Sequence, residues 1–330
     1  MRVALIGRTQ MLYNSALALA QAGHELRCVL TAPAAPEYTR TEADFERLAT
    51  RLGCPFLCAR SAAAPEALAM LSGCDIGVSM NWVGVLGPEV LDLFPLGVLN
   101  AHPGELPRYR GNACQGWAIL RGEERLGLSI HVMRPGELDC GRVVHQEFLD
   151  LTPEVANAEV WAWLEAAVPQ GFVAALDRLG RDPGFTLFDA RADDPAGFRG
   201  YPRLPVDGYI DWTRPALDIA RLVRAAGPPL PGAYTYADLG GRVDKLAVLE
   251  ARPHPLPLRD LAVPGHILRN DPQSGVSLVA CGQGALELLR CRDGSGREYA
   301  PGREWKSIRL RLGIRAEDMV WMMWGGDGPH

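Results

Sequence analysis

The chain has few lysines and no excess of positive charge. Lys245 and Lys306 are its only lysines, and its 34 lysine and arginine residues are outnumbered by 39 aspartates and glutamates, which gives a formal net charge of −5. Without a global positive field, the chain has no general means of attracting a phosphate backbone. The composition therefore disfavours nucleic acid as the main partner.

Long hydrophobic runs and metal-type cysteine spacings are also missing. No run of about 18 apolar residues occurs, and polar Arg8, Thr9 and Gln10 follow the first apolar segment, so neither a membrane span nor a signal peptide is predicted. The eight cysteines form no C-x-x-C pair and have no histidine couple nearby, which argues against zinc and against a disulfide framework. We expect a cytoplasmic protein with reduced thiols, no metal and no membrane partner.

Glycine is scarce in the first strand-to-helix turn, whose sequence is IGRTQMLYN. A turn that holds a pyrophosphate needs the pattern G-x-G-x-x-G, so that the backbone can approach the phosphates closely. The P-loop pattern is absent as well. These two absences disfavour a dehydrogenase and an ATPase.

The first 200 of the 330 residues contain alternating strand and helix patterns. Strands are expected at 2–7, 25–31, 74–80, 97–100, 127–133 and 142–148. Helices are expected at 11–22, 41–53, 63–73 and 115–122, and the segment Thr152-Pro153-Glu154 predicts a long helix from there to residue 180, kinked at Pro169. Alternating strands and helices predict a Rossmann-like, doubly wound and mainly parallel α/β sheet.

The rest of the chain has a different pattern. Residues 201–212 have the proline, glycine and aspartate content of a linker. A helix at 213–226 is followed by short strand patterns at 232–236, 243–251, 264–269, 275–280, 285–291 and 307–311. We therefore expect a larger α/β domain over 1–200 and a smaller β-rich, OB-like barrel over 213–330. The methionines and tryptophans at 318–326 would either dock within the chain or form a homodimer interface.

The densest polar chemistry lies in residues 97–141. Asn100 and His102 end an apolar strand two residues apart, so their side chains project from one face at its carboxyl end, where open α/β sheets bind ligands. Asp139 follows another apolar strand in the tight loop GELDCG and can return to that edge. These groups can perform acyl transfer, because histidine relays protons, the carboxylate orients it and the amide donates to a developing oxyanion.

Each of these residues also has a structural interpretation. A single histidine beside a strand is more often a core residue with satisfied hydrogen bonds, and an asparagine or aspartate near a strand end more often stabilises a turn. The combination of all three with the polar loop PRYRG favours a catalytic site.

Several ordered motifs resemble the N10-formyltetrahydrofolate-dependent formyltransferases. In the first domain they are NAHPGELPRYRG, WAILRGE, GLSIHVM and ELDCGRVV. Further along, LPVDGYIDW, IARLVRAAGPPLPGAYTY and PGHIL are similar to the C-terminal domain of the family members that act on methionyl-tRNA or UDP-4-amino-4-deoxyarabinose. The resemblance implies a formyltransferase catalytic domain over 1–200, followed by a formyltransferase-type C-terminal domain.

The resemblance also implies roles for site residues. Asn100 and protonated His102 would stabilise the oxyanion formed when a primary amine attacks the formyl carbon of N10-formyltetrahydrofolate, and Asp139 would raise the pKa of His102. The proton from the amine would reach N10 through His102 or through a water held by Asp139, and no metal is required. Backbone contacts to the pterin map onto Gly84, Val85 and Leu86 and onto the loop containing Arg134, Gly136 and Asp139. The apolar segment at 83–86 has an equally good interpretation as core.

Three departures from the tRNA-modifying branch bear on the acceptor. The segment TAPAAPEYTRTEADFE has Arg40 as its single base among four acids, where that branch has a basic loop. Residues 205–330 contain sixteen lysines and arginines against fifteen aspartates and glutamates, although tight tRNA binding needs several phosphate contacts. Cys114 and Gln115 stand in RGNACQGW, where the tRNA enzymes usually have a proline after RGAA.

We therefore expect the acceptor to be a small amine, a nucleotide-linked 4-amino-4-deoxy sugar. Candidate contacts to its diphosphate or sugar are Arg8, Gln10, Arg110 and Asn112. The alternatives are an amino acid or hydroxyornithine-type amine of a peptide or siderophore pathway, methionyl-tRNA, and, outside the enzymes, a folate-binding protein without turnover. A thiol nucleophile at Cys114 is disfavoured, because the sequence shows no base next to it.

Overall fold

The computed structural model describes residues 1–35, 38–238, 243–257, 260–315 and 318. These residues form two compact units. The first comprises residues 1–115, 124–152 and 159–202, and the second comprises residues 116–123, 153–158 and 203 onward. Apart from Asp318, the expected docking or dimerisation segment at 318–326 lies outside the described residues.

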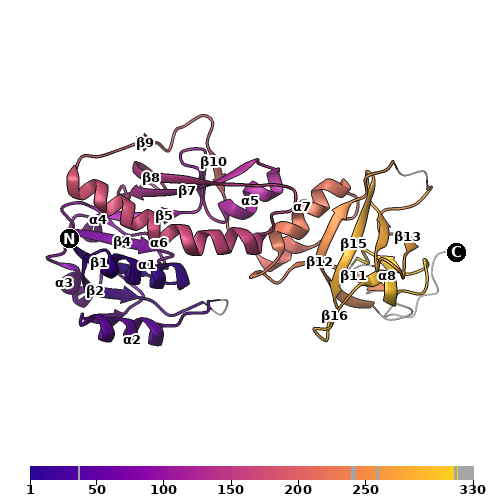
Figure 1. Cartoon of the computed structure of the whole chain (residues 1–330), viewed down its shortest axis with the longest axis horizontal. Coiled ribbons are helices and arrows are strands. Elements are labelled where there is room, and N and C mark those ends of the chain that lie inside the picture. The colour runs from indigo at the N-terminus through magenta and orange to yellow at the C-terminus, as the bar shows by residue number, and fades with distance from the viewer. Residues whose placement is uncertain (36–37, 239–242, 258–259, 316–317, 319–330) are drawn as a thin grey trace. The chain divides into compact units, whose positions relative to one another are not determined.

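The first unit is built on an eight-stranded sheet with the order β3-β2-β1-β4-β5-β7-β8-β9 (Figure 1). Its strands are β1 (Arg2–Gly7), β2 (Glu25–Thr31), β3 (Phe56–Cys58), β4 (Ile76–Met80), β5 (Val98–His102), β7 (Arg125–Val132), β8 (Gly141–Asp150) and β9 (Phe188–Ala190). The pairs from β3 to β5 are parallel, as a doubly wound fold requires. The pairs β5–β7, β7–β8 and β8–β9 are antiparallel, so the part of the sheet beyond β5 departs from the parallel pattern.

Helices cover both faces of this sheet. They are α1 (Gln10–Gln21), α2 (Glu42–Leu52), α3 (Pro65–Leu71), α4 (Pro88–Leu91), the start of α5 (Cys114–Arg121) and nearly all of α6 (Asn157–Arg181). Ala4 and Ile6 of β1 pack in one core cluster with residues of α3 and α4. Val3 and Leu5 point to the other face and are equally buried. Burial on both faces explains why β1 is an uninterrupted apolar run.

Local signals at the helix ends agree with the sequence in some places and not in others. The carboxylate of Asp44 accepts from the backbone N–H of Thr41 at 2.9 Å, and Gly53 ends α2 with φ 68°. The long helix was expected from Thr152 but begins at Asn157, because the residues around Pro153 form a turn. The helix continues through Pro169 to Arg181, close to the expected end, and the kink at Pro169 stays a prediction.

The sequence patterns missed five short strands, β3, β6, β9, β10 and β16, and two of them form a separate ribbon. β6 (Tyr109–Gly111) pairs in parallel with β10 (Phe198–Gly200) in a separate ribbon. Both strands are only three residues long, too short for a hydrophobic period to register. The ribbon matters because β6 carries backbone groups that bind two residues of the candidate site.

The second unit is a nearly closed antiparallel barrel with the order β13-β14-β15-β12-β11-β17. Its elements are η1 (Pro205–Gly208), α7 (Ala216–Ala226), β11 (Ala233–Asp238), β12 (Val243–Pro253), β13 (Ile267–Asn270), β14 (Ser277–Ala280), β15 (Ala285–Arg292), β16 (Glu298–Tyr299), α8 (Pro301–Glu304) and β17 (Arg311–Leu312). A bridge between His266 and Arg311 joins the two ends of the sheet. The expected OB-like, β-rich architecture is therefore present, whereas the role of 201–212 as a linker stays a prediction.

No helix among the described residues is long and apolar enough to span a membrane. In the same part of the chain, no group of three or more histidine, cysteine, aspartate or glutamate side chains is placed to hold a metal ion.

Candidate active site

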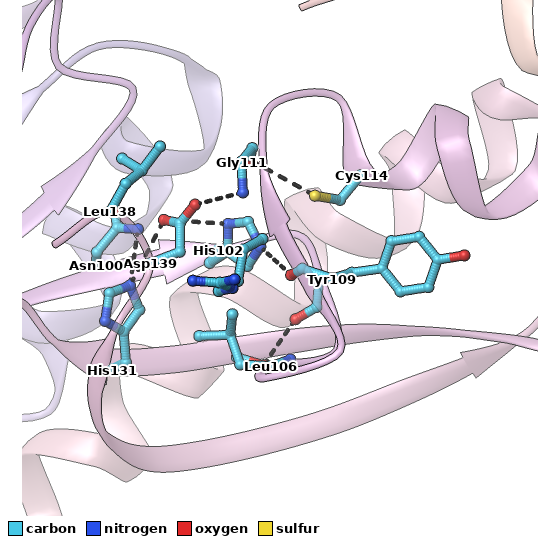
Figure 2. Close-up of polar contacts among 12 residues, drawn as sticks. Asn100, His102, Leu106, Tyr109, Gly111, Cys114, His131, Leu138 and Asp139 are labelled. Atoms are coloured by element: carbon cyan, nitrogen blue, oxygen red, sulfur yellow. Dashed lines mark hydrogen bonds and ion pairs between the residues drawn. The ribbon is translucent and has the colours of Figure 1, made fainter. Parts of the chain in front are cut away.

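Two side chains at the end of β5 begin the candidate site. Asn100 and His102 lie two residues apart on this strand, so both project from the same face of the sheet. Asp139 comes from the loop between β7 and β8 and reaches His102, with 3.5 Å between its Oδ1 and Nδ1 of the imidazole (Figure 2). The structure therefore brings together the three residues singled out in the sequence.

Both ring nitrogens of His102 have acceptors. Nε2 lies 2.8 Å from the backbone carbonyl oxygen of Tyr109 in β6, and Nδ1 lies beside the Asp139 carboxylate. A neutral imidazole has one N–H and can satisfy only one of these acceptors, whereas an imidazolium satisfies both. The surroundings of His102 therefore suit its protonated form.

The electrostatics of His102 agree with this geometry. Burial lowers the pKa of its imidazolium, but the Asp139 carboxylate, the Cys114 side chain and the Tyr109 carbonyl outweigh burial and raise the pKa to about 9. His102 is 4% exposed and Asp139 is 8% exposed, so solvent screens the pair weakly. At neutral pH, His102 is a buried hydrogen-bond donor with a positive charge.

Backbone constraints hold Asp139 in place. Its own φ is 52°, in the left-handed region that non-glycine residues rarely occupy. Its Oδ2 accepts a hydrogen bond of 2.7 Å from the backbone N–H of Gly111. Gly111 has φ 90°, and a Cβ there would lie 2.2 Å from the carbonyl oxygen of Gly200, so only glycine fits at this position. The β6–β10 ribbon thus fixes the donor that orients Asp139.

A second glycine lies directly against the imidazole. A Cβ on Gly104 would lie 2.4 Å from Nε2 of His102 and 2.6 Å from the Tyr109 carbonyl oxygen. The Gly104 carbonyl accepts from the Ser129 hydroxyl at 2.7 Å, which anchors the turn after β5 to β7. Gly104 therefore leaves the space that the hydrogen bond between His102 and Tyr109 needs.

Two site residues were missed or dismissed at the level of sequence. His131 of β7 lies directly opposite Asn100 of β5 and contacts both Asn100 and Asp139. Cys114, next to which the sequence shows no base, donates from Sγ to the Gly111 carbonyl at 3.5 Å and helps to raise the pKa of His102. Neither contact could be predicted, because one depends on the antiparallel register of β5 and β7 and the other on the path of the loop before α5.

The two segments expected to contact the folate lie in loops next to these strands. Gly84 and Val85 follow β4, and Val85 is 79% exposed, whereas Leu86 is buried in the core cluster of α3 and α4. The core interpretation thus holds for Leu86 but not for Val85. In the loop before β8, Gly136 has φ 75° and Leu138 is 47% exposed. Exposed apolar side chains on both loops suit an aromatic pterin ring.

Arg134 belongs to the same loop but its guanidinium is engaged by protein groups. Its Nη2 lies 2.9 and 2.8 Å from the two carboxylate oxygens of Asp189, and Nη1 lies 3.6 Å from Glu137. Arg134 thereby ties the loop to β9, and its contact with the folate stays a prediction.

Arg8 lies in the turn between β1 and α1, and Gln10 is the first residue of α1, at the carboxyl edge of the parallel strands. Arg8 donates from Nε to the carbonyl of Asn81 at 3.1 Å and from Nη1 to the carbonyl of Pro33 at 2.9 Å. Gln10 donates to Asn14 and accepts from Nε of Arg40 at 2.7 Å. The structure thus places both residues at the edge that also carries Asn100 and His102.

Arg110 and Asn112 follow the site in β6 and just after it. The guanidinium of Arg110 donates from Nη2 to the carbonyl of Ala192 at 2.6 Å and from Nη1 to Sγ of Cys140 at 3.7 Å. The backbone N–H of Asn112 donates to the carbonyl of Gly200 at 2.9 Å. Arg110 therefore supports the loop behind Asp139, and its role in substrate binding stays a prediction.

Comparison with known proteins identifies families whose sequences match this chain. The formyl transferase family matches residues 1–176, and the formyl transferase C-terminal domain family matches residues 205–308. A methionyl-tRNA formyltransferase of Methylobacterium sp. (strain 4-46) is 31% identical over 320 residues, which cover 96% of this chain and 99% of that protein.

Two solved structures share the fold at low sequence identity. HypX from Aquifex aeolicus in complex with tetrahydrofolic acid has a TM-score of 0.60 and 17% identity, over 93% of this chain and 47% of that one. WlaRD, a sugar 3N-formyl transferase crystallised with dTDP and 5-N-formyltetrahydrofolate, has a TM-score of 0.61 and 11% identity. The match covers 87% of this chain and 97% of WlaRD. The chain belongs to the formyl transferase family and is an enzyme that transfers a formyl group from N10-formyltetrahydrofolate.

Proposed function

We propose that the acceptor is the primary amine of a small phosphorylated molecule, a nucleotide-linked 4-amino-4-deoxy sugar, and that the reaction takes place in the cytoplasm. The observation that carries the proposal is the position of Arg8 in the turn just before α1. The first backbone N–H groups of a helix have no partner within the helix and attract anions. Among the described residues, Nη2 of Arg8 has no protein acceptor, so it can join these N–H groups in binding a phosphate.

Arg40 provides a second argument, against a polyanionic acceptor. Arg40 is the single base in the segment between β2 and α2, and its guanidinium is occupied by Gln10 and by Asp44, whose Oδ1 lies 3.3 Å from Nη1. The guanidinium also lies 4.3 Å from the ring centroid of Tyr13. A base held in this way by the protein is a poor contact for a tRNA phosphate.

The chemistry assigned to the site follows from the charges described above. Protonated His102 and the side-chain amide of Asn100 donate hydrogen bonds to the oxygen of the formyl group as negative charge develops there. Asp139 keeps His102 protonated and orients its ring. The amine loses a proton during the attack, and N10 of the folate gains one; His102 or a water beside Asp139 carries the proton between them.

The acceptor can be tested with a panel of amines. The purified protein is incubated with N10-formyltetrahydrofolate and, in turn, with nucleotide-linked 4-amino and 3-amino sugars, N5-hydroxyornithine and methionyl-tRNA, and the release of tetrahydrofolate is recorded. We expect turnover with a nucleotide-linked 4-amino sugar, and turnover with the 3-amino sugars alone would contradict the assignment of the amine position. Turnover with N5-hydroxyornithine or methionyl-tRNA, and not with the sugars, would overturn the proposal.

The role of Arg8 is tested with the same assay. Replacing Arg8 with alanine should raise KM for the phosphorylated acceptor by about 10-fold or more, because a charge-assisted hydrogen bond to phosphate contributes about 1.5–3 kcal/mol. KM for the folate should change little. Arg51, at the exposed end of α2, provides the control, and Arg51→Ala should leave both constants unchanged.

Methionyl-tRNA is the second candidate acceptor, and sequence similarity favours it. The relative from Methylobacterium is a methionyl-tRNA formyltransferase, and its similarity extends over both domains. If this chain acts on tRNA, its activity should fall steeply between about 50 and 200 mM salt, because phosphate contacts release counterions. Activity on a nucleotide sugar involves few charges and should change far less over that range.

A further inference from the structure

We propose that His131 is a positioning residue that holds the side-chain amide of Asn100 in the orientation needed to donate a hydrogen bond to the reacting formyl oxygen. The inference rests on the role proposed above for Asn100 and extends it to a residue outside the set Asn100, His102 and Asp139. What carries it is a chain of hydrogen bonds that runs from the Cys140 carbonyl through His131 to Asn100. Figure 2 shows the contact between His131 and Asn100.

The fold places His131 beside Asn100 by strand register. β5 and β7 are antiparallel, and Asn100 is paired directly with His131. Directly opposed residues of an antiparallel pair project from the same face, with their Cβ atoms close together. Nδ2 of Asn100 accordingly lies 3.2 Å from Nε2 of His131.

The opposite side of the His131 ring fixes its tautomer. Nδ1 lies 3.1 Å from the backbone carbonyl oxygen of Cys140, which can only accept a hydrogen bond. Nδ1 must therefore carry the hydrogen, and in a neutral ring Nε2 is then an acceptor. The partner that fits this acceptor is the amide nitrogen of Asn100 rather than its oxygen, so His131 dictates which way the amide points.

This orientation leaves a donor available. The amide nitrogen of Asn100 carries two hydrogens, of which one is donated to His131. The second can be donated to the developing oxyanion. With the amide turned by 180°, Oδ1 would take the place of the nitrogen, and an oxyanion next to it would meet a lone pair instead of a hydrogen.

The charges around His131 keep its ring neutral. Burial lowers its pKa, and protonated His102 lowers it further, while Asp139 and the carbonyl of Cys140 oppose these effects; the pKa falls to about 4. Asp139 Oδ1 lies 3.9 Å from Nε2 of His131 and 3.5 Å from Nδ1 of His102. The same carboxylate therefore lies next to a neutral ring, His131, and a charged ring, His102. Above pH 5, His131 is therefore neutral, and its Nε2 accepts the hydrogen bond from the Asn100 amide.

Two substitutions separate this role from simple packing. The amide of a glutamine can place its oxygen near the former position of Nε2, whereas the shorter asparagine places its amide near Nδ1. His131→Asn should thus keep the hydrogen bond to the Cys140 carbonyl and lose the acceptor for Asn100. His131→Gln should retain that acceptor.

Kinetics with the acceptor that the wild-type enzyme formylates give the first readout. His131→Asn should lower kcat by about 10- to 100-fold, part of the loss seen when an oxyanion donor is removed. KM for the folate should stay within about twofold, and His131→Gln should recover most of kcat. In an Asn100→Ala background, His131→Asn should have little further effect, because the two residues act through one hydrogen bond. Equal losses in both backgrounds would show a structural role and overturn the proposal.

A second readout needs no acceptor, so it remains decisive if the proposed acceptor is wrong. Long-range 1H–15N NMR spectra of the full chain, with labelled histidine, report the tautomer of each imidazole. We expect His131 to be neutral and protonated at Nδ1 from pH 5 to 8. A charged His131 at pH 7, or one protonated at Nε2 alone, contradicts the proposal.

Discussion

The Nδ1 atom of His102 lies 3.5 Å from Oδ1 of Asp139, and both side chains are almost completely buried. Burial by itself would favour a neutral imidazole. The carboxylate reverses this preference and is the largest of the contributions that raise the pKa of His102. Asp139 therefore decides the charge of the ring that the chemistry uses.

Replacing Asp139 with asparagine should shift the alkaline limb of the pH profile of kcat/KM. In the wild type, His102 loses its proton near its pKa of about 9, so activity should decline above that pH. In Asp139→Asn, burial acts without the opposing charge, the pKa falls, and the decline should begin at a lower pH. The amine acceptor is the same in both assays, so its own titration cancels in the comparison. Identical alkaline limbs would contradict the pairing.

The same pair should make stability depend on pH. The folded-state pKa of His102 lies above the ordinary value of 6.5, so its contribution is fully present below pH 6.5 and is lost as the pH rises through about 9. Urea unfolding at pH 6 and pH 9.5 should show this loss in the wild type and a smaller one in Asp139→Asn.

Replacing His102 with alanine should abolish most of the formyl transfer. Loss of the acidic group should lower kcat by roughly 10²–10⁴-fold, the range typical of acid–base residues. The fold should survive, as judged by circular dichroism. His24→Ala is the matched control, because His24 precedes β2 at the amino edge of the sheet, opposite to the site. Near-normal kcat in His102→Ala would remove His102 from the mechanism.

Much of the fold could be predicted from periodicity. The parallel strands are buried on both faces and appear in the sequence as apolar runs, of which RVALIG and CDIGVSM are examples. The barrel strands could be predicted because turn signals separate them. Helix α6 was expected five residues too early, since a cap followed by proline also forms the turn that precedes this helix.

The site was predictable only in part. Asn100 and His102 are close in sequence, and their spacing fixes their common face. Gly104, His131 and the carbonyl of Tyr109 reach the site through a tight turn, an antiparallel register and a three-residue strand. None of these three groups has a local pattern in the sequence, because the position of each depends on which backbone segment, distant in sequence, packs beside the strand or turn that carries it.

Cys114 should tune His102 rather than act as a nucleophile. Its side chain raises the pKa of His102, after Asp139 in importance, and is itself 1% exposed. Cys114→Ala should therefore keep kcat within about 10-fold of the wild type and move the alkaline limb to slightly lower pH. A loss above about 10³-fold, together with a formyl adduct on the wild-type thiol seen by mass spectrometry, would instead support covalent catalysis.

Replacing Gly104 with alanine tests the space around the imidazole. The added Cβ would lie 2.4 Å from Nε2 of His102 and 2.6 Å from the carbonyl oxygen of Tyr109, both in rigid surroundings. Relieving the overlap must break the hydrogen bond between them, so kcat should fall, and overpacking should cost about 1–3 kcal/mol of stability. Gly294→Ala is the control, because a Cβ at Gly294 has nothing within 4 Å. If Gly104→Ala keeps both its kcat and the alkaline limb of the wild type, the hydrogen bond from His102 to Tyr109 does not support catalysis.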